Sequence, residues 1–118
     1  MTAFDFEPQF VPLIESGRKI STIRKTKRGA VGRKMQLYTG QRTPHCRLIK
    51  EVECVAIYEF SINVNRLVSC RHPDAGYLWR QEGFESPKEF IDFFQNQYGL
   101  PFYGYLHEWN PTTPAEKE

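Results

Sequence analysis

The stretch Gly17-Arg18-Lys19-Ile20-Ser21-Thr22-Ile23-Arg24 follows a predicted short helix and leads into a predicted strand. The apolar spacing of residues 4–16 predicts the helix, in which Pro12 is tolerated only in the first turn. Gly17 stands where a residue in the left-handed conformation ends a helix. Residues 20–24 alternate and are rich in β-branched side chains, which predicts a strand. Residues 4–24 are therefore predicted to form a helix, a turn and a strand in that order.

Positive charge is concentrated in and just after this stretch. Residues 18–34 contain eight lysines and arginines and no acidic residue, although the whole chain carries a net charge of only +2. Up to Glu53 there are eleven basic and five acidic residues, whereas beyond it there are five basic and nine acidic ones. Cations are costly to bury, so a folded core does not explain such a cluster. The cluster indicates an anionic partner such as a phosphate or a nucleic acid.

The rest of the chain mixes strand and helix patterns, after a basic loop at residues 25–32. We expect strands at 34–39, 46–60 and 102–109, a short strand within 61–70, and helices at 74–83 and 87–98. The stretch 46–60 fits either one long bent strand or two strands with a bulge. In the last helix Ser86 is an N-cap, Glu89 completes a capping box and Gly99 ends the helix. Its phenylalanines recur at helical spacing, which favours a core face over a surface for stacking bases.

Length and element order define the fold class. A chain of 118 residues is expected to form one domain over residues 1–109, followed by a frayed tail at 110–118. Strands interleaved with two or three helices favour an α+β fold with a small, strongly bent sheet or barrel. No apolar run is long enough to span a bilayer, and the first residues lack the pattern of a signal peptide. We therefore expect a cytoplasmic protein that does not contact a membrane.

The cysteines do not indicate a disulfide framework or a metal site. Cys46, Cys54 and Cys70 are odd in number and have no CxxC spacing, which favours reduced thiols. A zinc site could be drawn from His45, Cys46, Cys70 and His72. Neighbouring strand residues point to opposite faces, however, so His45 and Cys46 are poorly placed to bind one ion. We expect no metal and no organic cofactor.

The chain resembles the ASCH domain, a branch of the PUA-like superfamily, over nearly all of residues 4–109. The central feature is the motif Gly-x-Lys-x-x-Thr-x-Arg, which starts at Gly17 and ends at Arg24. The other matching features are the helix before Gly17, the strand between Gly32 and Gly40, the triplet Glu82-Gly83-Phe84, the Ser86 helix with Phe90, Phe93 and Phe94, its end at Tyr98-Gly99, and the last strand ending in Trp109.

This resemblance implies a small, PUA-like mixed β-barrel flanked by two to three helices, with a cleft that the motif lines. Members similar to this chain include amidohydrolases that remove the acetyl group from N4-acetylcytidine, and others are described as nucleases. The Lys, Thr and Glu proposed as catalytic in the amidohydrolases fall on Lys19, Thr22 and Glu82. The chain departs from the compact amidohydrolases in its length, in its basic residues 25–34 and in Ser21. These departures favour a polymeric, phosphate-rich ligand.

The catalytic hypothesis depends on the charge state of Lys19. A threonine hydroxyl needs a base before it becomes a nucleophile. A lysine can be that base only if its pKa falls from about 10.4 toward 7 or 8. Arg18, Arg24 and partial burial would lower the pKa of Lys19, whereas a nearby Glu82 would raise it. The sequence leaves this balance open.

Two classes of function fit these residues. We favour a metal-independent hydrolase that acts on a modified nucleoside or on nucleic acid, with an amide hydrolysis of the N4-acetylcytidine type. The alternative is a non-catalytic module that binds single-stranded RNA, and a ribonuclease or a sensor of a small nucleotide would use the same cleft. In each case the residues expected to contact the ligand are Arg18, Ser21, Arg24, Lys25, Lys27, Arg28 and Tyr38.

Overall fold

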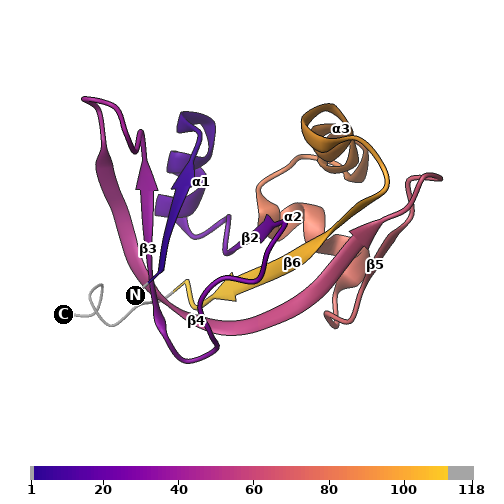
Figure 1. Cartoon of the computed structure of the whole chain (residues 1–118), viewed down its shortest axis with the longest axis horizontal. Helices are drawn as coiled ribbons and strands as arrows, with labels where there is room; N and C mark the ends of the chain where they lie inside the picture. The colour runs from indigo at the N-terminus through magenta and orange to yellow at the C-terminus, as the bar shows by residue number, and fades with distance from the viewer. Residues whose placement is uncertain (1, 112–118) are drawn as a thin grey trace.

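The computed structural model describes residues 2–111 and has the expected α+β architecture (Figure 1). The expected tail at 110–118 lies mostly outside these residues. Two short 3-10 helices, η1 and η2, precede α1 and α2. In chain order the elements are β1 (Thr2–Phe6), η1 (Pro8–Phe10), α1 (Val11–Ser16), β2 (Ser21–Arg24), β3 (Lys34–Thr39), β4 (Arg47–Ile62), β5 (Val68–Cys70), η2 (Ala75–Tyr77), α2 (Leu78–Glu82), α3 (Pro87–Tyr98) and β6 (Phe102–Trp109).

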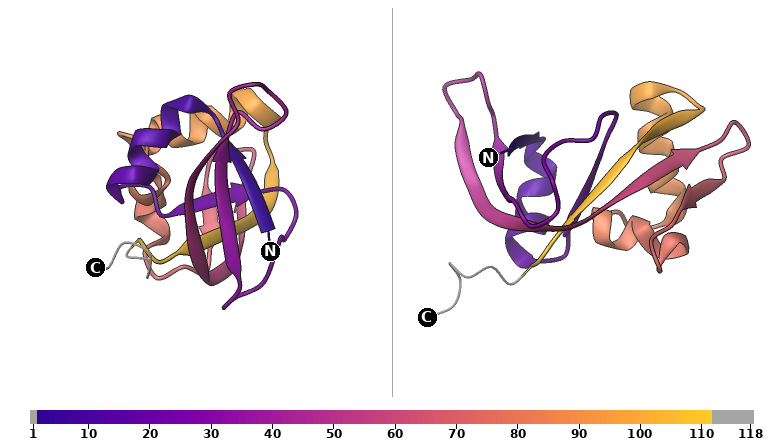
Figure 2. Two further views of the ribbon diagram at one scale, coloured as in Figure 1. Left: turned by 90° about the vertical axis from the view of Figure 1, so that its left-hand side faces the viewer. Right: turned by 60° about the horizontal axis from the view of Figure 1, so that its bottom comes forward.

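The strands form one sheet in the order β1-β3-β4-β6-β2, with β5 paired to the far end of β4. Among residues 2–111, the β1–β3 pair is parallel and the other strand pairs are antiparallel. The 16-residue strand β4 runs through the whole sheet and bends sharply (Figures 1 and 2). Its register shifts against β6 between Cys54 and Ala56. The stretch that the sequence left open is therefore one long strand with a bulge.

The first strand was not predicted from the sequence. Residues 4–6 belong to β1, and the α-helix starts only at Val11. Phe4 and Phe6 are buried while Asp5 is exposed, which is the two-residue period of a strand. The prediction was correct for the end of the helix, because Gly17 adopts the left-handed conformation with φ of 86°.

The sheet does not close into the barrel that the resemblance implied. Within residues 2–111, β1 and β2 end the strand order and no backbone ladder joins them. Two arginines bridge them instead. Arg24 donates from Nη2 to the Asp5 carbonyl at 2.9 Å, and Arg28 donates from Nη2 to the Ala3 carbonyl at 2.6 Å. Both guanidinium groups lie over the Phe4 ring, at 5.1 and 4.6 Å. Hydrogen bonds from Arg24 and Arg28 therefore connect β1 to the β2 segment in place of strand pairing.

We call this contact between β1 and β2, made by Arg24 and Arg28, the seam. His107 also lies in the seam. It is fully buried, its ring lies 5.3 Å from Phe4, and its Nε2 accepts the Arg28 backbone N–H at 3.0 Å. Burial, together with the charges of Arg24 and Arg28, lowers the pKa of His107 to about 4. The imidazole is therefore neutral at neutral pH, and Nδ1 carries its proton because Nε2 is an acceptor.

This pKa predicts an acid-sensitive stability. Between pH 6.5 and about 4 the unfolded chain binds a proton at His107 while the folded chain does not, so lowering the pH destabilises the fold. We expect His107 to contribute about 2–3 kcal/mol to this loss. The measurement is the free energy of unfolding against pH for the wild type and His107→Phe. The variant should lack this part of the slope, and equal slopes in both proteins would contradict the prediction.

The last helix packs as expected. Ser86 Oγ accepts the Glu89 N–H at 3.1 Å, which confirms the N-cap. Glu89 instead accepts the N–H of Glu85, one residue before the position that a capping box requires. Phe90 and Phe94 are buried and pack against Phe60 of β4, at ring distances of 5.9 Å each, so the aromatic face of α3 is core.

Candidate active site

Lys19, Thr22 and Glu82 line one small pocket of about 130 Å³. All three side chains are almost completely buried, with exposed fractions of 2%, 4% and 3%. Lys19 lies in the turn after α1, Thr22 on β2 and Glu82 at the end of α2. In Figure 1, β2 lies between α1 and α2. The structure thus brings together the residues proposed as catalytic, including the one that is distant in sequence.

Backbone contacts hold the turn of Lys19 to both α1 and α2. The Lys19 N–H donates to the Leu13 carbonyl and the Ile20 N–H donates to the Gln81 carbonyl, both at 2.9 Å. Gly83 follows Glu82 with φ of 98°, and a Cβ there would lie 2.9 Å from Leu13 Cδ1. Glycine at this position therefore lets α2 end directly beside Lys19.

Lys19 and Glu82 form a buried ion pair. Lys19 Nζ lies 3.3 Å from Glu82 Oε1 and donates to the Glu82 carbonyl at 2.8 Å. Nζ also lies 4.8 Å from the centre of the Phe10 ring. Burial lowers the pKa of Lys19 and outweighs Glu82, which raises it. Burial likewise raises the pKa of Glu82 against the opposing effect of Lys19. The pKa values of the two groups are therefore pushed towards each other.

Thr22 is paired with Arg24 rather than with Lys19. Arg24 Nε donates to Thr22 Oγ1 at 3.1 Å, and the same guanidinium donates to the Asp5 carbonyl. An oxygen that accepts from a cation keeps its own hydrogen free to donate or to be removed. The arrangement therefore places a positive charge beside the hydroxyl and leaves its proton available.

Ser21 occupies a different position from the one expected for a ligand contact. Its side chain is fully buried, and its hydroxyl donates to Glu82 Oε2. The two oxygens of Glu82 therefore have separate partners, Ser21 on Oε2 and Lys19 on Oε1.

The walls and mouth of the pocket were mostly missed by sequence reasoning. Five phenylalanines form the walls, namely Phe6, Phe10, Phe84, Phe93 and Phe94. Asp5, Glu7, Gln97 and Tyr98 surround the mouth and are exposed. The lining holds three carboxylates and two cations, so this pocket is not the basic cleft that the sequence predicted. The alternation of residues 4–7 was the available signal, but it was interpreted as part of a helix.

The other cations are spread over the surface. Arg18 donates to the Phe84 carbonyl at 2.6 Å and helps to line a separate hollow with Asp74 and Arg80. Lys25 is exposed, and its Nζ lies 5.4 Å from the Tyr98 ring at the pocket mouth. Lys27 is exposed as well. Arg28 donates to the Ala3 carbonyl in the seam between β1 and β2. These four side chains therefore lie at separate places on the molecule.

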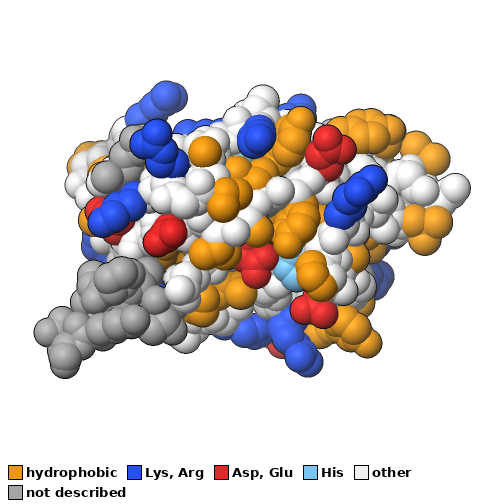
Figure 3. Space-filling model, turned by 90° about the horizontal axis from the view of Figure 1, so that it is seen from below, with side chains coloured by type: hydrophobic (Ala, Val, Ile, Leu, Met, Phe, Trp, Pro, Cys, Tyr) orange, Lys and Arg blue, Asp and Glu red, His pale blue; other side chains and the backbone are white. Residues whose placement is uncertain are grey.

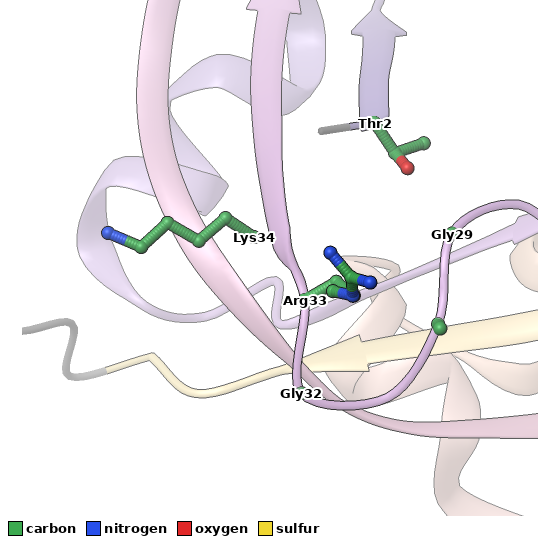
Figure 4. Close-up of a pocket in the computed structure, with 6 residues that line it drawn as sticks. Thr2, Gly29, Gly32, Arg33 and Lys34 are labelled. Atoms are coloured by element: carbon green, nitrogen blue, oxygen red, sulfur yellow. The ribbon is translucent and has the colours of Figure 1, made fainter.

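Two further hollows lie outside this pocket. One of about 490 Å³ lies between Thr2 and residues 29–34, where Arg33 and Lys34 point in different directions (Figure 4). The other is a groove of about 900 Å³ across β4, β5 and β6, lined by Lys25 and by Tyr58, Tyr103 and Tyr105. Tyr38 lies elsewhere, on β3, and donates to Gln36 at 3.4 Å. Viewed from below, hydrophobic side chains form a band across the molecule with charges of both signs beside it (Figure 3).

Across residues 2–111, no three histidine, cysteine or carboxylate side chains are grouped in a way that could hold a metal ion. None of the helices in the described part of the chain is long and apolar enough to cross a membrane.

Comparison with known proteins identifies the fold. No protein-family model and no curated protein matches the sequence. The crystal structure of ASCH from Zymomonas mobilis matches with a TM-score of 0.60 and 19% identity, over 92% of this chain and 65% of that one. Serine-to-alanine and tyrosine-to-phenylalanine variants of that protein both match with a TM-score of 0.58, at 20% and 18% identity, over 92% and 97% of this chain and 66% and 76% of theirs. The chain therefore has the fold of an ASCH protein.

Proposed function

We propose that this pocket belongs to a hydrolase that cleaves an amide on a modified nucleoside, in a reaction of the N4-acetylcytidine type. The observation that carries the proposal is the buried Lys19–Glu82 pair next to the Thr22 hydroxyl, at the bottom of an aromatic pocket. A buried ion pair is weak support for stability, and titratable groups with shifted pKa values in a pocket are typical of catalytic sites.

The size and lining of the pocket favour a single flat group as the part of the ligand that enters. Pockets that enclose a drug-sized molecule measure about 300–1,000 Å³, whereas this one measures about 130 Å³. The phenylalanine walls suit the flat face of a nucleobase, which stacks on aromatic rings. A sugar would remain at the mouth, near Asp5, Glu7 and Tyr98.

The residues supply each requirement of amide hydrolysis. The Thr22 oxygen forms a bond to the acyl carbon, and its proton passes to the Lys19–Glu82 pair. The pair returns that proton to the amide nitrogen as the carbon–nitrogen bond breaks, and water then hydrolyses the resulting threonine ester. The guanidinium of Arg24 lies beside the reacting hydroxyl and stabilises the negative charge that develops on the acyl oxygen.

The direct test is hydrolysis of N4-acetylcytidine by the purified protein. We expect release of cytidine and acetate that survives a chelator and disappears in Lys19→Ala, while binding of the product cytidine stays within a few-fold. Lys27→Ala, which removes an exposed cation outside the pocket, is the matched control and should keep its activity. Failure of the wild type to release acetate at high enzyme concentration would remove this substrate.

The alternative function is binding or cleavage of single-stranded RNA, and the groove across β4, β5 and β6 favours it. Tyr103 is 69% exposed there, and Lys25 links the groove to Tyr98 at the pocket mouth. Exposed tyrosines beside a cation can stack on unpaired bases. A non-catalytic RNA-binding module predicts that Lys19→Ala is no worse than Lys27→Ala and that affinity falls steeply with salt.

A further inference from the structure

Ser21 is a polar residue whose side chain is completely buried. It lies on β2 two residues before Ile23, on the same face of the strand, and both side chains are buried. A hydroxyl in such a place needs a hydrogen-bond partner, because an unpaired one costs about 1–3 kcal/mol. The partner here is the carboxylate of Glu82.

The contact divides the Glu82 carboxylate between two donors. The Ser21 hydroxyl donates to Oε2, and Lys19 Nζ lies 3.3 Å from Oε1. A carboxylate with a donor on each oxygen cannot rotate without breaking one of these bonds. Exposed fractions of 0% for Ser21 and 3% for Glu82 exclude water as a ready replacement.

We propose that Ser21 is a positioning residue that holds the Glu82 carboxylate in place and in its charged form beside Lys19, for the proton transfer assigned to that pair. The inference rests on the proposed function for its catalytic consequence. Ser21 itself touches no ligand, because its hydroxyl is buried behind the carboxylate and does not line the pocket. It replaces the ligand-binding role that the sequence suggested for this residue.

Loss of the hydroxyl has a defined chemical effect. Ser21 is one of the groups that lower the pKa of Glu82 against the effect of burial. Without it, that pKa rises, and Glu82 takes up a proton at a higher pH. A hydrogen bond to a charged group is strong enough to move such a pKa by about one unit. The acid limb is the low-pH side of the pH–activity profile, where activity falls as Glu82 takes up a proton. It then moves to higher pH by the same amount.

The experiment compares Ser21→Ala with the wild type by two readouts. Carboxyl-carbon NMR follows the titration of Glu82, assigned with Glu82→Gln, and needs no substrate. Hydrolysis of N4-acetylcytidine against pH gives kcat and KM. We expect the Glu82 midpoint and the acid limb both to rise by about one pH unit, and kcat below the limb's midpoint to fall about tenfold with little change in KM.

Two further variants guard against a purely structural effect. Ser21→Cys keeps the shape with a weaker donor and should lie between Ser21→Ala and the wild type in both readouts. It also provides the comparison if Ser21→Ala fails to fold. Ser69→Ala makes the same change at an exposed position on β5 and should change neither readout.

The outcomes separate this inference from the proposed function. An unchanged Glu82 midpoint in Ser21→Ala and Ser21→Cys overturns the role of Ser21. A raised midpoint with no hydrolysis in any protein supports the effect of Ser21 on Glu82 and overturns the amidohydrolase instead. A raised midpoint with an unmoved acid limb overturns the catalytic consequence.

Discussion

Breaking the Lys19–Glu82 pair from either side is expected to remove activity and to cost about 3–5 kcal/mol of stability, because one charged partner is left buried alone. Lys19→Met and Glu82→Leu are the suitable single changes, since both fill the space with apolar atoms. The double variant should recover part of the lost stability, because no buried charge remains, although the Ser21 hydroxyl loses its partner at a cost of about 1–3 kcal/mol. Its activity should stay lower by about 10²–10⁴-fold, the contribution typical of a proton-transferring group.

Denaturant unfolding and turnover of N4-acetylcytidine measure the two effects separately. The Lys88–Asp92 pair on α3 is the matched control, because its ions lie closer, at 2.8 Å, but the lysine side chain is 81% exposed. Lys88→Met should cost less than about 1 kcal/mol and leave activity intact. A double variant as unstable as the sum of the single ones would show that the two residues do not act as a pair. Full activity in the double variant would exclude them from the chemistry.

Thr22→Val is expected to reduce turnover by about 10³-fold or more, because it removes the proposed nucleophile and keeps the shape of the side chain. The change also takes away the acceptor of Arg24 Nε. We therefore expect a stability loss of about 1–2 kcal/mol, which is small enough to leave the protein folded. Thr22→Ser keeps the hydroxyl and should retain activity within about tenfold.

The measurement is a single-turnover assay combined with mass spectrometry of the protein during the reaction. An acetyl group attached to the wild type, and missing from Thr22→Val, would support attack by the threonine. Near-normal turnover in Thr22→Val would show that water attacks the amide directly, with Thr22 acting only as a partner of Arg24.

Much of the fold could be predicted from the sequence because its signals are local. The observed bounds of β3, α3 and β6 match the predicted ranges. A Ser86 cap and a left-handed Gly17 act within a turn of the residues that they control, so no distant contact is needed to place these ends. The same locality placed Lys19 and Thr22 near each other, and the resemblance added Glu82.

Contacts between segments that are distant in sequence were decided only by the tertiary structure. β1 is a strand because it pairs with β3, some thirty residues away in sequence (Thr2 opposite Met35), and its short apolar pattern also fits a helix. Arg24 and Arg28 donate to backbone carbonyls of β1, and these partners come from a segment that the sequence placed in a helix. The sequence predicted the relative positions of site residues that share one turn of the chain. It did not predict contacts between distant segments, such as the buried hydrogen bond from Ser21 to Glu82.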